Sequence, residues 1–147
     1  MAEIKQSIDI DAPPEQVWAV LSDVERVGEW VAEHQGFPDG APAELRTGVE
    51  YRQTVKAAGQ DVDLTWTVVE HEAPTRLAFE GAGPAGASAT LRYALAPSGG
   101  GTRMDYATSF DLPGGALGSI VGKVAAPGED DARETLGRLK RIVEGDG

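Results

Sequence analysis

The residues that could do chemistry in this chain are polar side chains that recur at every second position of predicted strands. Their strict alternation with apolar neighbours places them on the inward face of a sheet. The polar members of this inward set are Gln6, Tyr51, Gln53, Tyr93, Tyr106 and Thr108. They carry hydroxyls and amides, whereas acid–base catalysis requires a group that titrates within reach of the reacting atom. The pattern therefore favours groups that orient a ligand in a mostly apolar pocket, and the alternative is a filled core in which they satisfy one another.

Aromatic side chains are the second set that could form such a pocket. Trp30, Trp66, Phe79 and Phe110 could line it, although each type is individually more common as ordinary core. Trp30 is the candidate for the pocket mouth, because the glycine-containing segment that follows it could act as a lid. The predicted ligand-binding residues are Trp30, Tyr51, Gln53, Trp66, Phe79, Tyr93, Tyr106, Thr108 and Phe110, and no catalytic residue is predicted.

Metal, cofactor and nucleophile motifs give no further site. The two histidines, His34 and His71, lack metal-ligand spacing and are expected on the solvated surface, so neither a metal nor a cofactor is predicted. Residues 81–86, GAGPAG, match a dinucleotide-binding fingerprint, but a strand pattern follows where a helix would be needed. Cysteine is absent, and the serines and histidines form no recognisable triad signature.

The elements that must position these residues begin with a strand and two helices. Isoleucines at positions 4, 8 and 10 alternate with polar residues, which predicts a strand. Pro13 and Pro14 then start a helix, and Ser22 or Asp23 caps a short second helix that ends around Trp30. Glycines and prolines predict that residues 33–44 form a loop.

Five further alternating segments predict a run of antiparallel strands. They lie near residues 49–56, 61–68, 77–79, 89–95 and 103–110 and are joined by short turns. Six charged residues fall on the outer face, where cross-strand pairs are expected: Arg52, Asp61, Asp63, Arg92, Arg103 and Asp105. A slip of one residue would exchange the two faces. The chosen register is preferred because it buries Leu64, Trp66, Leu91, Leu95 and Met104 together.

The tail of the chain, residues 114–143, predicts a long amphipathic helix that covers the inward face of the sheet. Apolar residues recur there at steps of three or four. Pro127 predicts a kink or break, with a fresh helix start at the acidic residues 129–131.

The composition limits the number of domains and the kinds of partner that this protein can have. A chain of 147 residues with 41% hydrophobic residues predicts one globular domain spanning residues 1–147. The net charge of −11 disfavours nucleic acid as a partner, and no apolar run is long enough to span a membrane. The first residues show no signal-peptide pattern, and with the lack of cysteine a cytoplasmic location is expected. Nothing in the pattern indicates an oligomeric state.

Three segments resemble the START-like superfamily, in its polyketide cyclase/dehydrase and lipid-transport (SRPBCC) branch. They are residues 8–25 (IDIDAPPEQVWAVLSDVE), 74–79 (PTRLAF) and 110–115 (FDLPGG). The resemblance implies an α+β helix-grip fold, in which a curved antiparallel sheet wraps around the C-terminal helix and encloses a cavity for apolar ligands. It also implies binding of a small hydrophobic or aromatic ligand, lipid- or polyketide-like. The alternatives it leaves open are a polyketide aromatase/cyclase or dehydratase, and an interaction or stress-response domain with a vestigial cavity.

Overall fold

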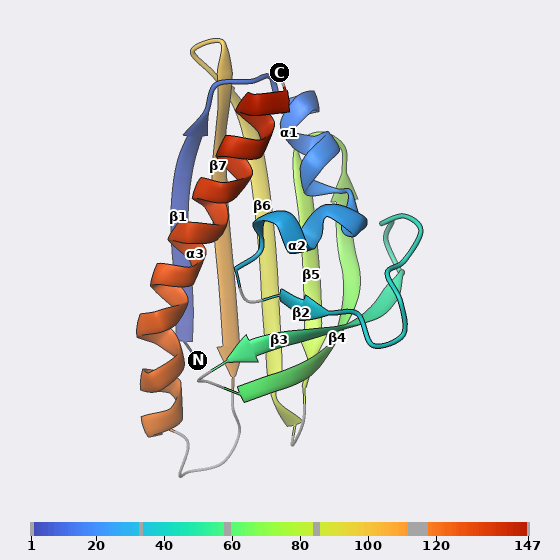
Figure 1. Ribbon diagram of the computed structural model, residues 1–147, viewed down its shortest axis with the longest axis vertical. Helices are drawn as coiled ribbons and strands as arrows, with labels where there is room; N and C mark the ends of the chain where they lie inside the picture. The colour runs from blue at the N-terminus through green and yellow to red at the C-terminus, as the bar shows by residue number, and fades with distance from the viewer. Residues whose placement is uncertain (1, 33, 58–59, 84–85, 112–117, 147) are drawn as a thin grey trace.

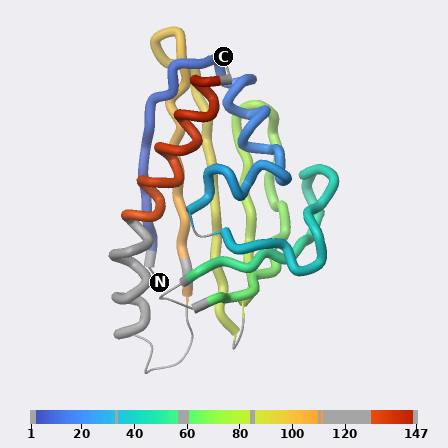
Figure 2. Tube along the Cα trace, in the orientation of Figure 1, coloured from blue at the N-terminus to red at the C-terminus, as the bar shows by residue number. Residues whose placement is uncertain are grey.

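The chain forms an α+β fold in which helices cover one face of a curled antiparallel sheet (Figure 1). The computed structural model describes residues 2–32, 34–57, 60–83, 86–111 and 118–146, and Figure 2 traces their path. Side chains are not described at residues 2, 57, 60, 110, 118–129 and 146.

The sheet has seven strands among the described residues. They are β1 (Ala2–Ile10), β2 (His34–Gly36), β3 (Glu50–Ala57), β4 (Gln60–Glu72), β5 (Arg76–Ala82), β6 (Ser88–Ser98) and β7 (Gly101–Asp111). Their spatial order is β1-β7-β6-β5-β4-β3-β2, and every neighbouring pair is antiparallel, as the alternation predicted. The prediction of a loop over residues 33–44 is wrong at β2, because a strand of three residues is too short to show periodicity.

Three short helical segments follow β1 in the predicted order. They are α1 (Pro14–Leu21), the 3₁₀ turn η1 (Val24–Arg26) and α2 (Val27–Trp30). Pro14 occupies the first turn of α1, where its missing N–H removes no helical bond. Of the two predicted caps, Asp23 caps η1 by accepting a 3.2 Å hydrogen bond from the backbone N–H of Glu25.

The long C-terminal helix α3 (Gly118–Asp146) runs diagonally past β1 and β7 in Figure 1. It continues through Pro127, so the predicted break and new start at residues 129–131 are wrong. A proline removes one backbone donor, and the apolar face farther along the helix offsets that loss. Ala132, Leu136, Leu139 and Val143 on this face are all at most 2% exposed.

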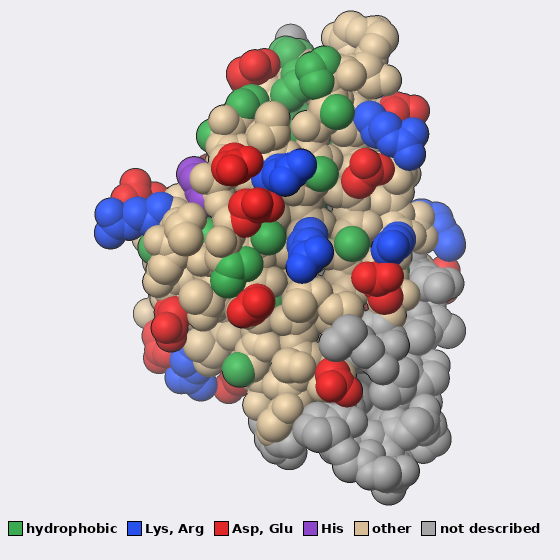
Figure 3. All heavy atoms as spheres, turned by 180° about the vertical axis from the view of Figure 1, so that it is seen from behind, with side chains coloured by type: hydrophobic (Ala, Val, Ile, Leu, Met, Phe, Trp, Pro, Cys, Tyr) green, Lys and Arg blue, Asp and Glu red, His purple; other side chains and the backbone are tan. Residues whose placement is uncertain are grey.

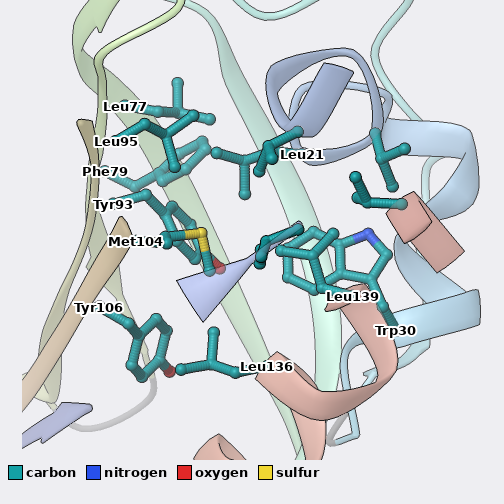
Figure 4. Close-up of a cluster of buried hydrophobic side chains, with 14 of the residues drawn as sticks. Leu21, Trp30, Leu77, Phe79, Tyr93, Leu95, Met104, Tyr106, Leu136 and Leu139 are labelled. Atoms are coloured by element: carbon teal, nitrogen blue, oxygen red, sulfur yellow. The ribbon is translucent and has the colours of Figure 1, made fainter. Parts of the chain in front are cut away.

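The core lies between α3, the short helices and the inner face of the sheet (Figure 4). The predicted register is confirmed, because the inner-face side chains of Trp66, Tyr93, Leu95 and Met104 are buried. The predicted outer-face charges at residues 52, 61, 63, 92, 103 and 105 lie on the solvent side of the sheet, partly or fully exposed. Arg52 and Asp63 form the expected cross-strand ion pair at 3.2 Å.

Candidate functional site

A chain of aromatic rings crosses the inner face from β2 to β5. Starting at His34, ring centroids lie 4.7 Å from His34 to Phe37, 6.0 Å from Phe37 to Tyr51 and 6.2 Å from Tyr51 to Phe79. Trp66 completes the chain, 6.1 Å from Phe79. Three of these contacts are edge-to-face, which is a preferred geometry for aromatic pairs, and the His34–Phe37 contact is tilted. The strands thus bring together three predicted residues, Tyr51, Trp66 and Phe79.

Within this row of aromatic rings, Tyr51 carries a hydroxyl group that could bind a ligand. It lies on β3 directly opposite Trp66 on β4, and its side chain is half-buried. Its hydroxyl makes no hydrogen bond to any residue that the structure describes, and burial raises the pKa of Tyr51 above its ordinary value. The group is therefore a neutral phenol that can donate or accept a hydrogen bond.

Gln53, two residues farther along β3, is engaged within the protein. Its side-chain oxygen accepts a 2.9 Å hydrogen bond from the indole N–H of Trp66. Its side-chain nitrogen lies 2.8 Å from Nδ1 of His34. Gln53 is 8% exposed, so the amide satisfies buried groups of its own fold.

The remaining predicted residues lie deeper or elsewhere on the sheet. Trp30 packs edge-to-face on Tyr93 at 6.1 Å, and Tyr93 lies 5.4 Å from Tyr106 (Figure 4). The Thr108 hydroxyl donates a 2.8 Å hydrogen bond to the backbone oxygen of Thr90. The side chain of Phe110 falls outside the described residues. The structure thus separates the predicted set into an aromatic chain at β2–β5 and a deeper tyrosine–tryptophan cluster.

Trp30 is not at a pocket mouth, contrary to the sequence-based expectation. Its side chain is 2% exposed, because α2 turns the indole inward beneath α3. Its Nε1 is a buried donor with no hydrogen-bond partner among the described residues. Such an unpaired donor is uncommon in protein interiors.

Three half-buried apolar side chains, here called the inner strip, lie at the end of the inner face that also holds Tyr51. Its members are Leu64 on β4 and Ala89 and Leu91 on β6, and the register places Trp66 and Gly81 between Tyr51 and Ala89. Farther along β6, Tyr93 and Leu95 on the same face are buried. The inner face is thus less deeply buried at the end where residues 51, 64, 89 and 91 lie.

His34 and Phe37 are parts of this region that the sequence analysis did not select. His34 is half-buried, so the expectation of a solvated surface histidine is wrong. The cause is the unpredicted strand β2, which places the ring against Gln53 and Phe37. The signal available in the sequence was weak, because β2 contributes only three residues. His71 is also half-buried, with its ring 5.3 Å from that of Trp18 on α1.

The glycine motif at residues 81–86 is explained by packing. Gly81 lies inside β5, and the next strand, β6, begins at Ser88, which leaves no room for the α-helix that the motif would need. A Cβ at Gly81 would lie 2.8 Å from the Trp66 ring. Among the residues described, no three histidines or carboxylates gather in a way that could hold a metal ion.

A separate hollow of about 720 Å³ lies on the outer face of the sheet. Figure 3 views the molecule from that side. The alanines at positions 78, 94 and 107 lie along it, and Lys5, Arg76, Arg92, Glu70 and Asp105 are among the charged residues around it. Small residues between long charged ones create this hollow, and charges of both signs suit water rather than an apolar ligand. The inner strip is therefore the better candidate for an apolar ligand.

Comparison with known proteins places the chain among relatives of the predicted kind. Residues 1–144 match the family described as polyketide cyclase/dehydrase and lipid transport. Toxin Rv0910 of Mycobacterium tuberculosis (strain ATCC 25618 / H37Rv) is 31% identical over 145 residues, which cover 99% of this chain and 100% of that protein. Uncharacterized protein Rv1546 of the same strain is 29% identical over 126 residues, 86% of this chain and 87% of the relative.

Solved structures support the same fold. The crystal structure of TTHA0849 from Thermus thermophilus matches with a TM-score of 0.75 at 21% identity and covers 99% of both chains. The predicted α+β helix-grip fold is thereby confirmed. In the described part of the chain, no helix is both long and apolar enough to cross a membrane.

Proposed function

Because this chain belongs to the polyketide cyclase/dehydrase and lipid transport family, we propose that it binds a small uncharged molecule, apolar or aromatic, between the inner face of the sheet and α3. The observation that carries the proposal is the Tyr51 hydroxyl. It has no partner among the described residues, and its ring packs against the apolar rings of Phe37 and Phe79 on the inner face. A polar group at the edge of apolar surface is the usual composition of a small-molecule site.

The chemistry of the strip selects for a ligand without charge at this end. Its members are hydrocarbon, and the rings packed around Tyr51 are aromatic, so an unpaired charge buried against them would be strongly destabilised. The raised pKa of Tyr51 keeps its proton on the oxygen, so the phenol donates to a carbonyl or hydroxyl oxygen of the ligand. A lipid- or polyketide-like molecule with an oxygen at one end has this composition.

The first test uses prodan, an uncharged fluorescent naphthyl ketone, as the probe. The wild-type protein should bind prodan and shift its emission to shorter wavelength. Tyr51→Phe should weaken binding by about three- to tenfold, because one hydrogen bond to the ketone is lost. Equal affinity of the two proteins would remove Tyr51 from the site.

A matched pair of tryptophan substitutions on β6 then locates the site. Leu91 faces the inner strip, and Ala94 faces the outer hollow of the same strand. Leu91→Trp should fill the inner site and abolish prodan binding, whereas Ala94→Trp should leave it unchanged. The reverse result would place the ligand on the outer face and would contradict the proposal.

Binding is favoured over a cyclase or dehydratase reaction because the accessible phenol is a poor proton donor. Its pKa is raised further from neutrality, which lowers its value as a general acid or base. Turnover of a poly-β-keto substrate that is lost in Tyr51→Phe would favour the enzyme instead. A vestigial cavity predicts that no uncharged apolar probe binds at all.

The full-length similarity to a protein named a toxin supports a second proposal, that this chain inhibits growth of a cell that produces it. Induced expression in a bacterial host, followed by colony counting, tests this directly. A version with an early stop codon controls for the cost of transcription. Normal growth at a high level of folded protein would exclude this function in that host.

A further inference from the structure

The hydrogen bonds that join Trp66, Gln53 and His34 have one possible direction. An indole nitrogen can only donate, so the oxygen of the Gln53 amide must face Trp66, at 2.9 Å. The amide nitrogen therefore faces Nδ1 of His34, at 2.8 Å, and donates to it. His34 must then hold its proton on Nε2 and keep Nδ1 unprotonated.

Protonation of His34 is incompatible with this arrangement. An imidazolium carries a hydrogen on both nitrogens, so its Nδ1–H would point at the amide N–H of Gln53. Rotating the amide by half a turn would move the conflict to Trp66, whose N–H would then face the amide nitrogen. Both Gln53 and Trp66 are buried, so water cannot easily replace a lost partner.

No charge on the neighbouring elements offsets this conflict in the described structure. From α2, Gly28 faces the imidazole without a side chain, and Glu29 of that helix pairs with Arg26 at 3.2 Å. The strand β3 presents Gln53 and Val55 to His34. After β2, the Phe37 ring packs at a tilt against the imidazole, while Asp39 pairs with Arg52 at 3.0 Å.

Burial lowers the pKa of His34, in agreement with this neutral geometry. Glu33 precedes His34 in the chain and lies outside the described residues, and the variant Glu33→Gln separates the effect of its carboxylate from that of His34.

Loss of the contacts of His34 would affect the whole of β2 and the residue that follows it. It begins β2, an edge strand of three residues that pairs with β3 through His34 and Gly36 across an irregular register. Phe37 follows β2 and touches both the His34 ring and the Tyr51 ring. Loss of the His34–Gln53 hydrogen bond would therefore loosen β2 and the aromatic wall beside Tyr51.

We propose that His34 is a pH-operated latch, which holds β2 against β3 when neutral and releases β2 and Phe37 when protonated. Its consequence for the ligand rests on the proposed function, since the released wall borders the Tyr51 site. The protein would then retain an apolar ligand near neutral pH and release it in acidic surroundings.

The latch is tested first without any ligand, by NMR of the full chain. At about pH 8, ¹⁵N spectra of the histidines should show a protonated Nε2 and an unprotonated, hydrogen-bonded Nδ1 for His34. Amide exchange should show protection at β2 that falls, relative to the rest of the sheet, by about tenfold or more as the pH drops to about 5.5. A proton on Nδ1, or protection that does not change, would overturn the latch.

Three variants make this result specific. His34→Asn keeps an acceptor for Gln53 but cannot be protonated, so β2 protection should become independent of pH. Gln53→Glu can accept from both Trp66 and a protonated His34, so the pH dependence should reverse and β2 should be held better in acid. Glu33→Gln should behave as wild type, and loss of the pH dependence in it would assign the effect to Glu33 and overturn the role of Gln53.

Prodan binding at the same two pH values tests the consequence for the ligand. Wild-type affinity should fall at least about threefold in acid, because the competent state is less populated, and His34→Asn should show no such fall. If prodan binds with equal affinity at both pH values while β2 opens, the latch does not regulate the site and that part of the proposal is wrong. If prodan binds at neither pH, the proposed function is wrong. The amide exchange of β2 then shows by itself whether His34 acts as a latch.

Discussion

Tyr51 and Gln53 lie two residues apart on one face of β3, yet their polar groups have opposite roles. The Gln53 amide is enclosed by Trp66 and His34 and satisfies both. The aromatic ring of Tyr51 contacts Phe37 and Phe79. Its hydroxyl has no hydrogen-bond partner among the described residues. A buried amide whose oxygen and nitrogen are both hydrogen-bonded stabilises the fold, whereas a phenol without a partner on apolar surface is available to a ligand.

The tight packing at Gly81 can be tested by adding a single methyl group. A methyl group at Gly81 would lie 2.8 Å from the six-membered ring of Trp66, which is 6% exposed and cannot move away freely. Gly81→Ala should therefore lower the free energy of unfolding by about 1–3 kcal/mol, measured by urea denaturation. Gly145→Ala, where nothing lies within 4 Å of the new Cβ, is the control and should not destabilise the protein. Equal stability of the Gly81 variant and wild type would show that Trp66 can shift.

The inward grouping of Tyr51, Gln53 and Trp66 could be predicted from their spacing, because side chains alternate between faces on every strand. The spacing could not predict which of their polar groups would lack a hydrogen-bond partner, because the partners come from other segments of the chain. His34 reaches Gln53 only through β2, and Phe37 reaches Tyr51 only from the residue after that strand. Trp30 shows the same limit, since its burial depends on the contact of α2 with α3.

At the level of elements, α3 is the part that depends most on tertiary packing. Its sequence contains Pro127 and several glycines, which are poor helix formers, yet the helix is continuous. The face formed by Ala132, Leu136 and Leu139 is buried against the core, and packing of this kind supplies most of the stability of helices in proteins. Local propensity therefore predicted a break that the whole fold does not make.

The contribution of that face can be measured at Leu139, which is 0% exposed and packs in the cluster of Figure 4. Leu139→Ala should destabilise the protein by about 2–5 kcal/mol, through lost burial and the cavity that remains. Arg141→Ala, at an exposed position of the same helix, should change stability by no more than about 0.5 kcal/mol. Similar effects at both positions, measured by thermal and urea unfolding, would contradict the described packing of α3.

At the level of the whole molecule, the sheet order and register could be predicted because many residues specify them at once. Five alternating segments each place apolar side chains inward, so a slip in one strand would expose several of them. The short strand β2 could not be predicted, because it carries no such repetition. The outer face remains charged and mixed in sign, as expected for the solvated side of an antiparallel sheet (Figure 3).

The pH dependence of overall stability should have a component from His34. The folded protein lowers the pKa of His34 below 6.5, so the unfolded chain takes up a proton at higher pH than the folded chain does. Stability from this group is therefore present above about pH 6.5 and is lost as the pH falls toward the folded pKa. Wild type should lose more stability than His34→Asn between about pH 8 and pH 5.5 in urea unfolding. Parallel curves for the two proteins would show that His34 has the same pKa in both states.

The central claim is that an uncharged apolar molecule binds on the inner face beside Tyr51. Native mass spectrometry after equilibration with prodan at neutral pH tests it most directly, because it counts bound molecules and compares variants in one experiment. The wild-type protein and Ala94→Trp should each carry one prodan, and Leu91→Trp should carry none. A wild-type protein that carries no prodan, or a complex that survives in Leu91→Trp and is lost in Ala94→Trp, would contradict the claim.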